Sequence, residues 1–185
     1  MSIPWYPDEL SFIAEEEIKV TITPQFSANR IQFLSGEYGP FMAGRPIKVP
    51  MWLALFLHSS HSCTLSPPKW LNTDTLKKCL RKEKEQKGIL SKLPRYYMEI
   101  SFTFLNRASN TLKDSDQIKT LIEDIWDIRF EKLRKSIIEG SAETVDQTQL
   151  PNVTQMELHL FREPITKITS LLTGLNEKIS INVEE

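Results

Sequence analysis

The stretch "IKTLIEDIWDIRFEKLRKSII", residues 118–138, decides the fold because it predicts one long helix with a wide apolar surface. At about 100° per residue, its apolar side chains cover an arc of roughly 200°, whereas a helix lying on one core needs a stripe of only about 100°. The helix is expected to start after Asp114 or Ser115 and to run to about Gly140. The arc contains Ile118, Leu121, Ile122, Ile125, Trp126, Ile128, Phe130, Leu133 and Ile137.

Two interpretations of this arc remain open from periodicity alone. In the first, the helix is buried on one side by the chain's own core and on the other side by a partner protein. In the second, it is a central helix wrapped by the other helices of the chain. Arg129 falls near the middle of the arc, and a buried arginine requires a carboxylate or several carbonyl oxygens as partners.

The rest of the chain after the Pro67-Pro68 pair is also helical in pattern. One helix has an N-cap at Asn72 or Thr73 and a stop at Gly88. The other expected elements are a helix that opens after Pro94, a polar loop at 141–149 and a helix at roughly 154–175.

Before the Pro67-Pro68 pair the chain consists of short elements separated by glycine and proline. A short acidic helix leads in, and two segments alternate apolar and polar residues as half-buried strands do. The expected elements are a helix at 8–17, strands at 18–23 and 30–35, a loop at 36–46 and a short strand at 47–50.

These patterns predict an α+β fold that is mainly α. A small β-rich domain with a short leading helix is expected over residues 1–65, a larger helical bundle domain over 66–175, and a flexible tail over 176–185.

Composition excludes several classes of protein. The chain has 185 residues, of which 40% are hydrophobic and 25% charged, so wholesale disorder is not expected. Its net charge of −1 argues against a protein that coats nucleic acid over its whole surface. Two cysteines do not make a disulfide scaffold, and a reducing compartment fits best. Neither a secretory nor a mitochondrial address is visible, and the apolar run at 49–57 is shorter than the roughly 20 residues that span a bilayer.

The apolar run leads into His58, His61 and Cys63, three potential zinc ligands within six positions. No paired spacing supplies a fourth ligand, so scaffold is the favoured interpretation and a metal-dependent enzyme the alternative. The phosphate-loop, dinucleotide-binding and nucleophile-elbow motifs are absent from the sequence. We therefore expect no catalytic residues, no metal, no cofactor and no small-molecule substrate.

Two charged segments are candidate binding surfaces. Residues 72–92 carry seven Lys or Arg and three acids, and an adaptor that binds nucleic acid through this basic helix is the alternative function. The acidic segment 8–17 has five acids and no base, and is either plain surface or a docking strip for a basic partner.

Four blocks of sequence resemble the Psf-two type of GINS subunit, the second partner of Sld-five in eukaryotic DNA replication. They extend in the family's order, and several contain rare residues. The blocks are "GPFMAGRPIKVPMWLA" (39–54), "CTLSPPKW" (63–70), "PRYYMEI" (94–100) and "IKTLIEDIWDIRFEKLR" (118–134).

The resemblance implies a function based on contact rather than catalysis. It implies a GINS-like fold and a non-catalytic scaffold within a heterotetramer of four GINS subunits, held together largely by helical domains. That complex would join the MCM ring and the Cdc-forty-five protein to form the active replicative helicase. Location in the nucleus, with an indirect association with chromatin and DNA, rests on the resemblance alone. No association with membranes is expected, because the apolar run at 49–57 is too short to span a bilayer.

The same resemblance assigns expected roles to particular residues. Each set below is an expectation for a different kind of contact. For subunit assembly the residues are Ile122, Ile125, Trp126, Arg129 and Leu133, with Tyr96 and Tyr97 either lying in the interface or supporting that helix; for packing between domains, Trp52, Leu53, Leu57 and Trp70; and for the loop facing the helicase, Tyr38, Phe41 and Arg45.

Overall fold

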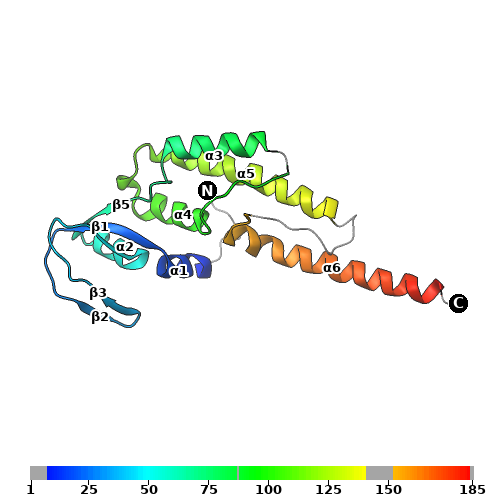
Figure 1. Cartoon of the computed structure of the whole chain (residues 1–185), viewed down its shortest axis with the longest axis horizontal. Helices are drawn as coiled ribbons and strands as arrows, with labels where there is room; N and C mark the ends of the chain where they lie inside the picture. The colour runs from blue at the N-terminus through cyan, green and yellow to red at the C-terminus, as the bar shows by residue number, and fades with distance from the viewer. Residues whose placement is uncertain (1–7, 87, 141–151, 184–185) are drawn as a thin grey trace. The chain divides into compact units, whose positions relative to one another are not determined.

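A computed structural model describes residues 8–86, 88–140 and 152–183 of the chain (Figure 1). The chain divides into two compact units, and the division passes through helices α3 and α5. The first unit comprises the chain up to Lys78 together with residues 96–122, and the second comprises residues 79–95 and 123–185. Each unit is described by itself.

The first unit is built on a three-stranded antiparallel sheet with the order β4-β1-β5. Strand β1 (Lys19–Pro24) lies in the middle, between β4 (Ile47–Pro50) and β5 (Cys63–Ser66). Alternate side chains of β1, Val20 and Ile22, are buried, as the period of two along a strand requires. They form a core with apolar residues of α2 (Met51–Ser59) and α1 (Asp8–Glu17), which are Met51, Leu53, Ala54, Leu55, Leu10 and Ala14.

A separate hairpin lies apart from this sheet (Figure 1) and consists of β2 (Ile31–Phe33) and β3 (Gly36–Tyr38). The predicted loop at 36–46 was therefore wrong in its first three residues, which form β3. Strand β5 (Cys63–Ser66) was also missed; it pairs with β1, which is distant in sequence.

The first unit also contains α4 (Tyr97–Arg107), the short 3-10 helix η1 (Ser109–Thr111) and the start of α5 (Ser115–Gly140). Two polar contacts join α1 to the α4 region. Arg107 forms an ion pair with Glu15 at 2.9 Å, and the Tyr96 hydroxyl donates to Glu17 at 2.9 Å. Tyr97 and Phe104 of α4 are fully buried.

The second unit contains the end of α3 (Thr73–Glu85), the greater part of α5, and α6 (Gln155–Val183). Helix α6 extends further than the predicted end near residue 175. The predicted loop at 141–149 lies outside the described residues. At the other end of α3, the Asn72 side chain accepts a hydrogen bond from the Thr75 N–H at 2.8 Å, so Asn72 caps the helix as predicted.

The expected fold class is confirmed: the chain is α+β and mainly α, with its β region at the N-terminal end, followed by helices. The predicted domain limits at residues 65 and 175 stay predictions. Among the helices that the structure describes, none is long and apolar enough to cross a membrane.

Candidate assembly surface and the ionic cluster beneath it

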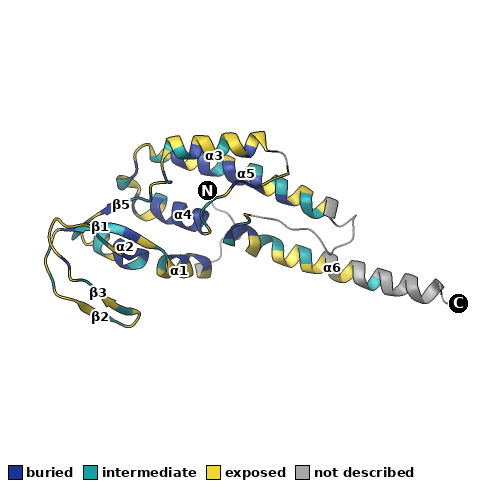
Figure 2. Cartoon of the chain, in the orientation of Figure 1, coloured by how far each residue is buried: buried dark blue, intermediate teal, exposed yellow. Residues whose placement is uncertain are grey.

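Arg129 is fully buried in the second unit and uses all five of its N–H donors (Figure 2 shows the buried face of α5). Its Nε and Nη2 donate to the two carboxylate oxygens of Glu157 at 2.6 and 2.8 Å. Its Nη1 donates to Glu83 at 2.7 Å and to the Ser91 carbonyl at 2.9 Å, and Nη2 also donates to the Asn152 carbonyl at 2.9 Å. The sequence-based expectation that Arg129 needs carboxylate and carbonyl partners is therefore confirmed, and the partners come from this chain.

Glu83 is the second centre of the cluster. Besides Arg129, it accepts hydrogen bonds from the Lys132 ammonium at 2.6 Å, and from the Ser91 hydroxyl and N–H at 2.6 and 2.9 Å. Burial by itself raises the pKa of Glu83, but the hydrogen bonds from Lys132, Ser91 and Arg129 outweigh it. The pKa therefore ends below its usual value, and Glu83 is ionised at neutral pH.

The cluster joins four segments of the second unit: α3, residues 89–91, α5 and the start of α6. Two cations, Arg129 and Lys132, face two carboxylates, Glu83 and Glu157, so the buried charge balances. Removing one partner of such a group leaves an uncompensated buried charge, which typically costs about 3–5 kcal/mol. The cluster thus fixes which faces of α5 and α6 are exposed on the second unit.

Glu157 has a second role at the start of α6. Its side chain accepts a hydrogen bond from the Thr154 N–H at 2.9 Å, which is one half of a capping box. The sequence pattern T-x-x-E at residues 154–157 is typical of a capping box and could have predicted this arrangement. The burial of Glu83 could also have been predicted from the sequence, since Glu83 continues the apolar stripe that runs through Leu76 and Leu80 on α3.

All seven residues predicted for subunit assembly are buried within the chain itself. Tyr96, Tyr97 and Ile122 lie in the first unit, and Ile125, Trp126, Arg129 and Leu133 lie in the second. Their part in assembly stays a prediction, and their burial means that they would act by supporting a surface rather than by forming it.

An aromatic group of the second unit reaches that surface. The ring of Trp126 lies 6.0 Å from that of Phe130, and Phe130 lies 5.0 Å from Phe161 on α6. Phe130 is 38% exposed, and Ile138 and Leu158 are more than half exposed. These side chains leave apolar area on α5 and α6 that this chain does not cover.

Helix α6 shows the same feature over a greater length. Its apolar residues recur at alternating spacings of three and four, the period by which a helix packs along another helix. Yet from Leu158 onward, none of the α6 side chains that the structure describes is buried (Figure 2). The residues at this spacing are Leu158, Phe161, Ile165, Ile168, Leu172, Leu175 and Ile179.

The other predicted residues lie in the first unit. Trp52 packs edge-on against Phe33 at 5.5 Å and against Tyr38 at 6.2 Å. Leu53 is buried, and Leu57 and Trp70 are partly buried. Their role in packing between domains stays a prediction.

In the predicted helicase-facing loop, Arg45 is exposed, Tyr38 is partly exposed and Phe41 is buried. Phe41 packs on Phe26 at 5.4 Å and so supports the loop from inside. Whether Tyr38 and Arg45 contact a partner stays a prediction.

The three candidate zinc ligands are dispersed. The His58 ring hydrogen-bonds to Asn110 at 3.2 Å, His61 is exposed, and Cys63 is buried in β5. Within residues 8–86, 88–140 and 152–183, no group of three His, Cys, Asp or Glu side chains is placed to hold a metal ion. The basic side chains of α3 are exposed, including Lys77, Lys78 and Arg81, and the nucleic-acid alternative stays a prediction.

The class of the protein follows from its similarity to known families. Residues 70–176 match the family described as "GINS complex protein helical bundle domain", and residues 6–66 match the "PSF2 N-terminal domain". The chain belongs to the PSF2 family of GINS complex proteins.

Curated relatives agree with this assignment. The chain is 38% identical to the human "DNA replication complex GINS protein PSF2", over 95% of this chain and 92% of the relative. It is 34% identical to the probable PSF2 of Brugia malayi, over 92% and 90%. It is 33% identical to PSF2 of Xenopus laevis, over 90% and 92%.

Proposed function

We propose that this chain is a non-catalytic scaffold subunit of a four-subunit GINS complex that acts in DNA replication in the nucleus. In this role it binds three other GINS subunits, and the complex joins the MCM ring and the Cdc-forty-five protein in the replicative helicase. The family match and the names of the relatives, which describe a DNA replication complex, support the proposal.

The observation that carries the proposal is the uncovered apolar stripe on α6. A helix of 29 residues extends roughly 43 Å. Helices in proteins obtain most of their stability from an apolar face packed on a neighbour. Since none of the described side chains after Leu158 is fully buried in this chain, we expect helices of other subunits to cover the stripe.

The ionic cluster prepares the surface for that contact. By holding Glu83, Glu157 and Arg129 together, it fixes α5 against the start of α6 and places Phe130 beside Phe161. A surface fixed before binding loses less conformational freedom on association. The buried residues Trp126 and Leu133 contribute to assembly through this support.

The first unit is the proposed surface toward the helicase ring, through Tyr38 and Arg45. Both lie on or next to the chain segment between β3 and β4, and neither is fully buried. This contact is a separate proposal from the assembly surface on α6 and is tested separately, by Arg45→Glu. That change should weaken co-purification of MCM proteins while leaving the four-subunit complex intact.

The assembly proposal is tested by co-expression with the three other GINS subunits, with size-exclusion chromatography and light scattering to measure stoichiometry. Wild type should give one complex with one copy of each subunit. The double variant Leu158→Glu/Ile165→Glu places two charges on the stripe and should be lost from the complex.

The matched control is Thr166→Glu, which adds a charge at an exposed position beside the stripe. It should assemble like wild type. If the double variant is recovered at wild-type stoichiometry, α6 is not the assembly surface. If wild type runs as a monomer beside the other three subunits, the scaffold proposal itself is wrong.

A further inference from the structure

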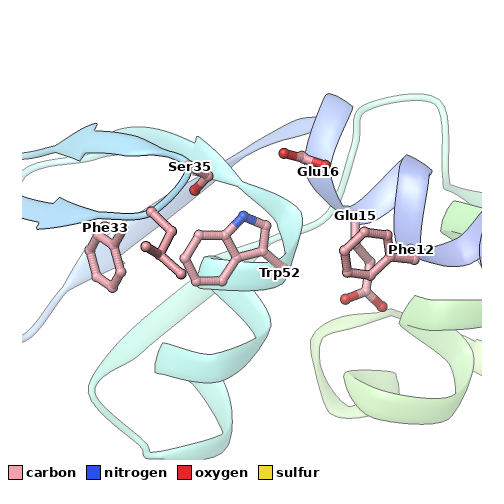
Figure 3. Close-up of a pocket in the computed structure, with 7 residues that line it drawn as sticks. Phe12, Glu15, Glu16, Phe33, Ser35 and Trp52 are labelled. Atoms are coloured by element: carbon pink, nitrogen blue, oxygen red, sulfur yellow. The ribbon is translucent and has the colours of Figure 1, made fainter.

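The first unit holds an apolar pocket of about 340 Å³ between α1, the β2–β3 hairpin and α2 (Figure 3). Figure 3 shows the Trp52 indole at its centre, with Phe33 on the hairpin side and Phe12 on the α1 side. We call it the hairpin pocket. Its apolar wall consists of Phe12, Phe33, Leu34 and Trp52, and its acidic rim of Glu15 and Glu16.

The wall combines a rigid base with exposed apolar groups. Trp52 is held edge-on by Phe33 at 5.5 Å and by Tyr38 at 6.2 Å, so the centre of the pocket is formed in advance. Phe12, by contrast, is 72% exposed, and Leu34 at the tip of the hairpin is fully exposed. Single exposed apolar residues are ordinary, but several of them around one concavity mark a site of interaction.

The rim gives this pocket a definite charge preference. Helix α1 has several carboxylates and no Lys or Arg. Glu15 is engaged by Arg107 and Glu17 by Tyr96, whereas Glu16 is exposed and forms no ion pair with any residue that the structure describes. A group that binds here therefore places apolar atoms beside Trp52 and meets a negative charge at the edge.

We propose that the hairpin pocket binds a partner polypeptide segment that carries one aromatic or large aliphatic side chain next to Lys or Arg. Its volume lies at the lower end of the range of about 300–1,000 Å³ typical of ligand pockets, so it accepts one or two side chains rather than a whole helix. The apolar side chain packs on Trp52 and Leu34, and the basic one faces Glu16. This surface is independent of the assembly stripe on α6.

Three fluorescein-labelled peptides test the proposal against the full-length chain by fluorescence anisotropy. The probe is Gly-Ser-Lys-Arg-Trp-Lys-Ser-Gly, the second peptide replaces its Trp by Ser, and the third replaces its basic residues by Gln. The probe should bind about tenfold more tightly than either of the others, because each of those loses one half of the recognition.

Two pairs of variants locate the binding site. Leu34→Ser should weaken binding of the probe by about tenfold, and Glu16→Gln by about threefold. Neither change removes a buried contact, so both variants should keep the wild-type circular dichroism and melting temperature. The matched controls are Met42→Ser, exposed in the same unit, and Glu9→Gln, exposed on the same helix, and both should bind like wild type.

Several outcomes would overturn the proposal. They are equal binding of all three peptides, equal weakening by the control variants, or no binding of the probe up to about 1 mM. Self-association of the free chain that Leu34→Ser abolishes would instead assign the pocket to a second copy. The peptide assay does not require assembly through α6. Leu34→Ser should leave the four-subunit complex intact, so a failure of this proposal and a failure of the assembly proposal can be told apart.

Discussion

Arg129 carries a full positive charge at a place that water does not reach. A buried ion is tolerated only when its hydrogen-bonding groups all have partners and an opposite charge lies nearby. Arg129 meets both conditions, since its five N–H groups reach two carboxylates and two carbonyl oxygens. The energetic consequence is asymmetric: the intact cluster contributes modestly, whereas a broken one is costly.

We therefore expect Arg129→Met to lower the free energy of unfolding by about 3–5 kcal/mol, because Glu83 and Glu157 would remain buried without their main partner. The free energy of unfolding of Arg129→Lys should lie between those of Arg129→Met and wild type, since an ammonium keeps the charge but offers three donors instead of five. Urea unfolding measures both. The control is Arg134→Met, which removes an exposed ion pair with Glu131 and should leave the urea midpoint unchanged. Equal midpoints for Arg129→Met and wild type would contradict the importance of the cluster.

The cluster also predicts how stability depends on pH. The folded-state pKa of Glu83 is below its ordinary value of 4.5, so Glu83 contributes stability above that value, and this contribution is lost as pH falls through the folded-state pKa. In Glu83→Gln, the free energy of unfolding should therefore depend less steeply on pH than in wild type as the pH falls below 4.5. Urea titrations at a series of pH values give the slope. If Glu83→Gln kept the wild-type slope, Glu83 would not be the titrating group.

At the scale of elements, the hairpin and its return to the sheet depend on Gly39. Gly39 has φ +118°, and a Cβ there would lie 3.2 Å from the Arg30 Cα and 3.3 Å from the Asn29 carbonyl oxygen. Gly39→Ala should therefore destabilise the first unit by about 1–3 kcal/mol, measured by thermal unfolding. Gly44→Ala is the comparison, since Gly44 has φ +76° but open space around it. Gly44→Ala should destabilise the first unit less than Gly39→Ala does. If it destabilised the unit more, the close approach of the backbone at Gly39 would not be what excludes a larger residue there.

The elements differ in how far they could be predicted from the sequence. The long helices α3 and α5 were predicted within a few residues, because their period extends over several turns and their ends carry capping signals such as Asn72. Strands β3 and β5 were not predicted. Strand β3 pairs with the neighbouring β2 in a segment whose glycines and prolines indicate a loop, and β5 depends on pairing with β1, which is distant in sequence.

Only part of the ionic cluster was predicted from the sequence. Arg129 was identified from its place in the apolar arc, but its partners Glu83 and Glu157 come from helices that are distant in sequence. Periodicity describes one helix at a time and does not show which helices meet. The stripe on α3 and the capping-box pattern at Thr154 would have indicated that these two glutamates are special, though not that they share one arginine.

At the scale of the whole molecule, apolar area is distributed unevenly between helices. Helices α4 and α5 bury most of theirs within the chain, including Phe104 and Ile125, although Phe130 and Ile138 of α5 are exposed, whereas α6 buries only its first turn among the described residues. In proteins, most of the stability of a helix comes from packing of its apolar face rather than from propensity. The stability of α6 should therefore depend on the presence of the other subunits, because anything that binds only the folded helix stabilises it.

Limited proteolysis with trypsin tests this dependence. In the free chain, the first cuts should follow Arg162 and Lys167, which are exposed on α6, because local opening of an unpacked helix needs little free energy. In the four-subunit complex, these sites should be protected by at least about tenfold in rate. Lys77 and Lys78 provide the internal control: they are also exposed, but lie on α3, next to the buried Leu76, and should be cut slowly in both forms. Cleavage at Arg162 that is as fast in the complex as in the free chain would mean that other subunits do not cover α6, and the uncovered stripe would then need a different partner.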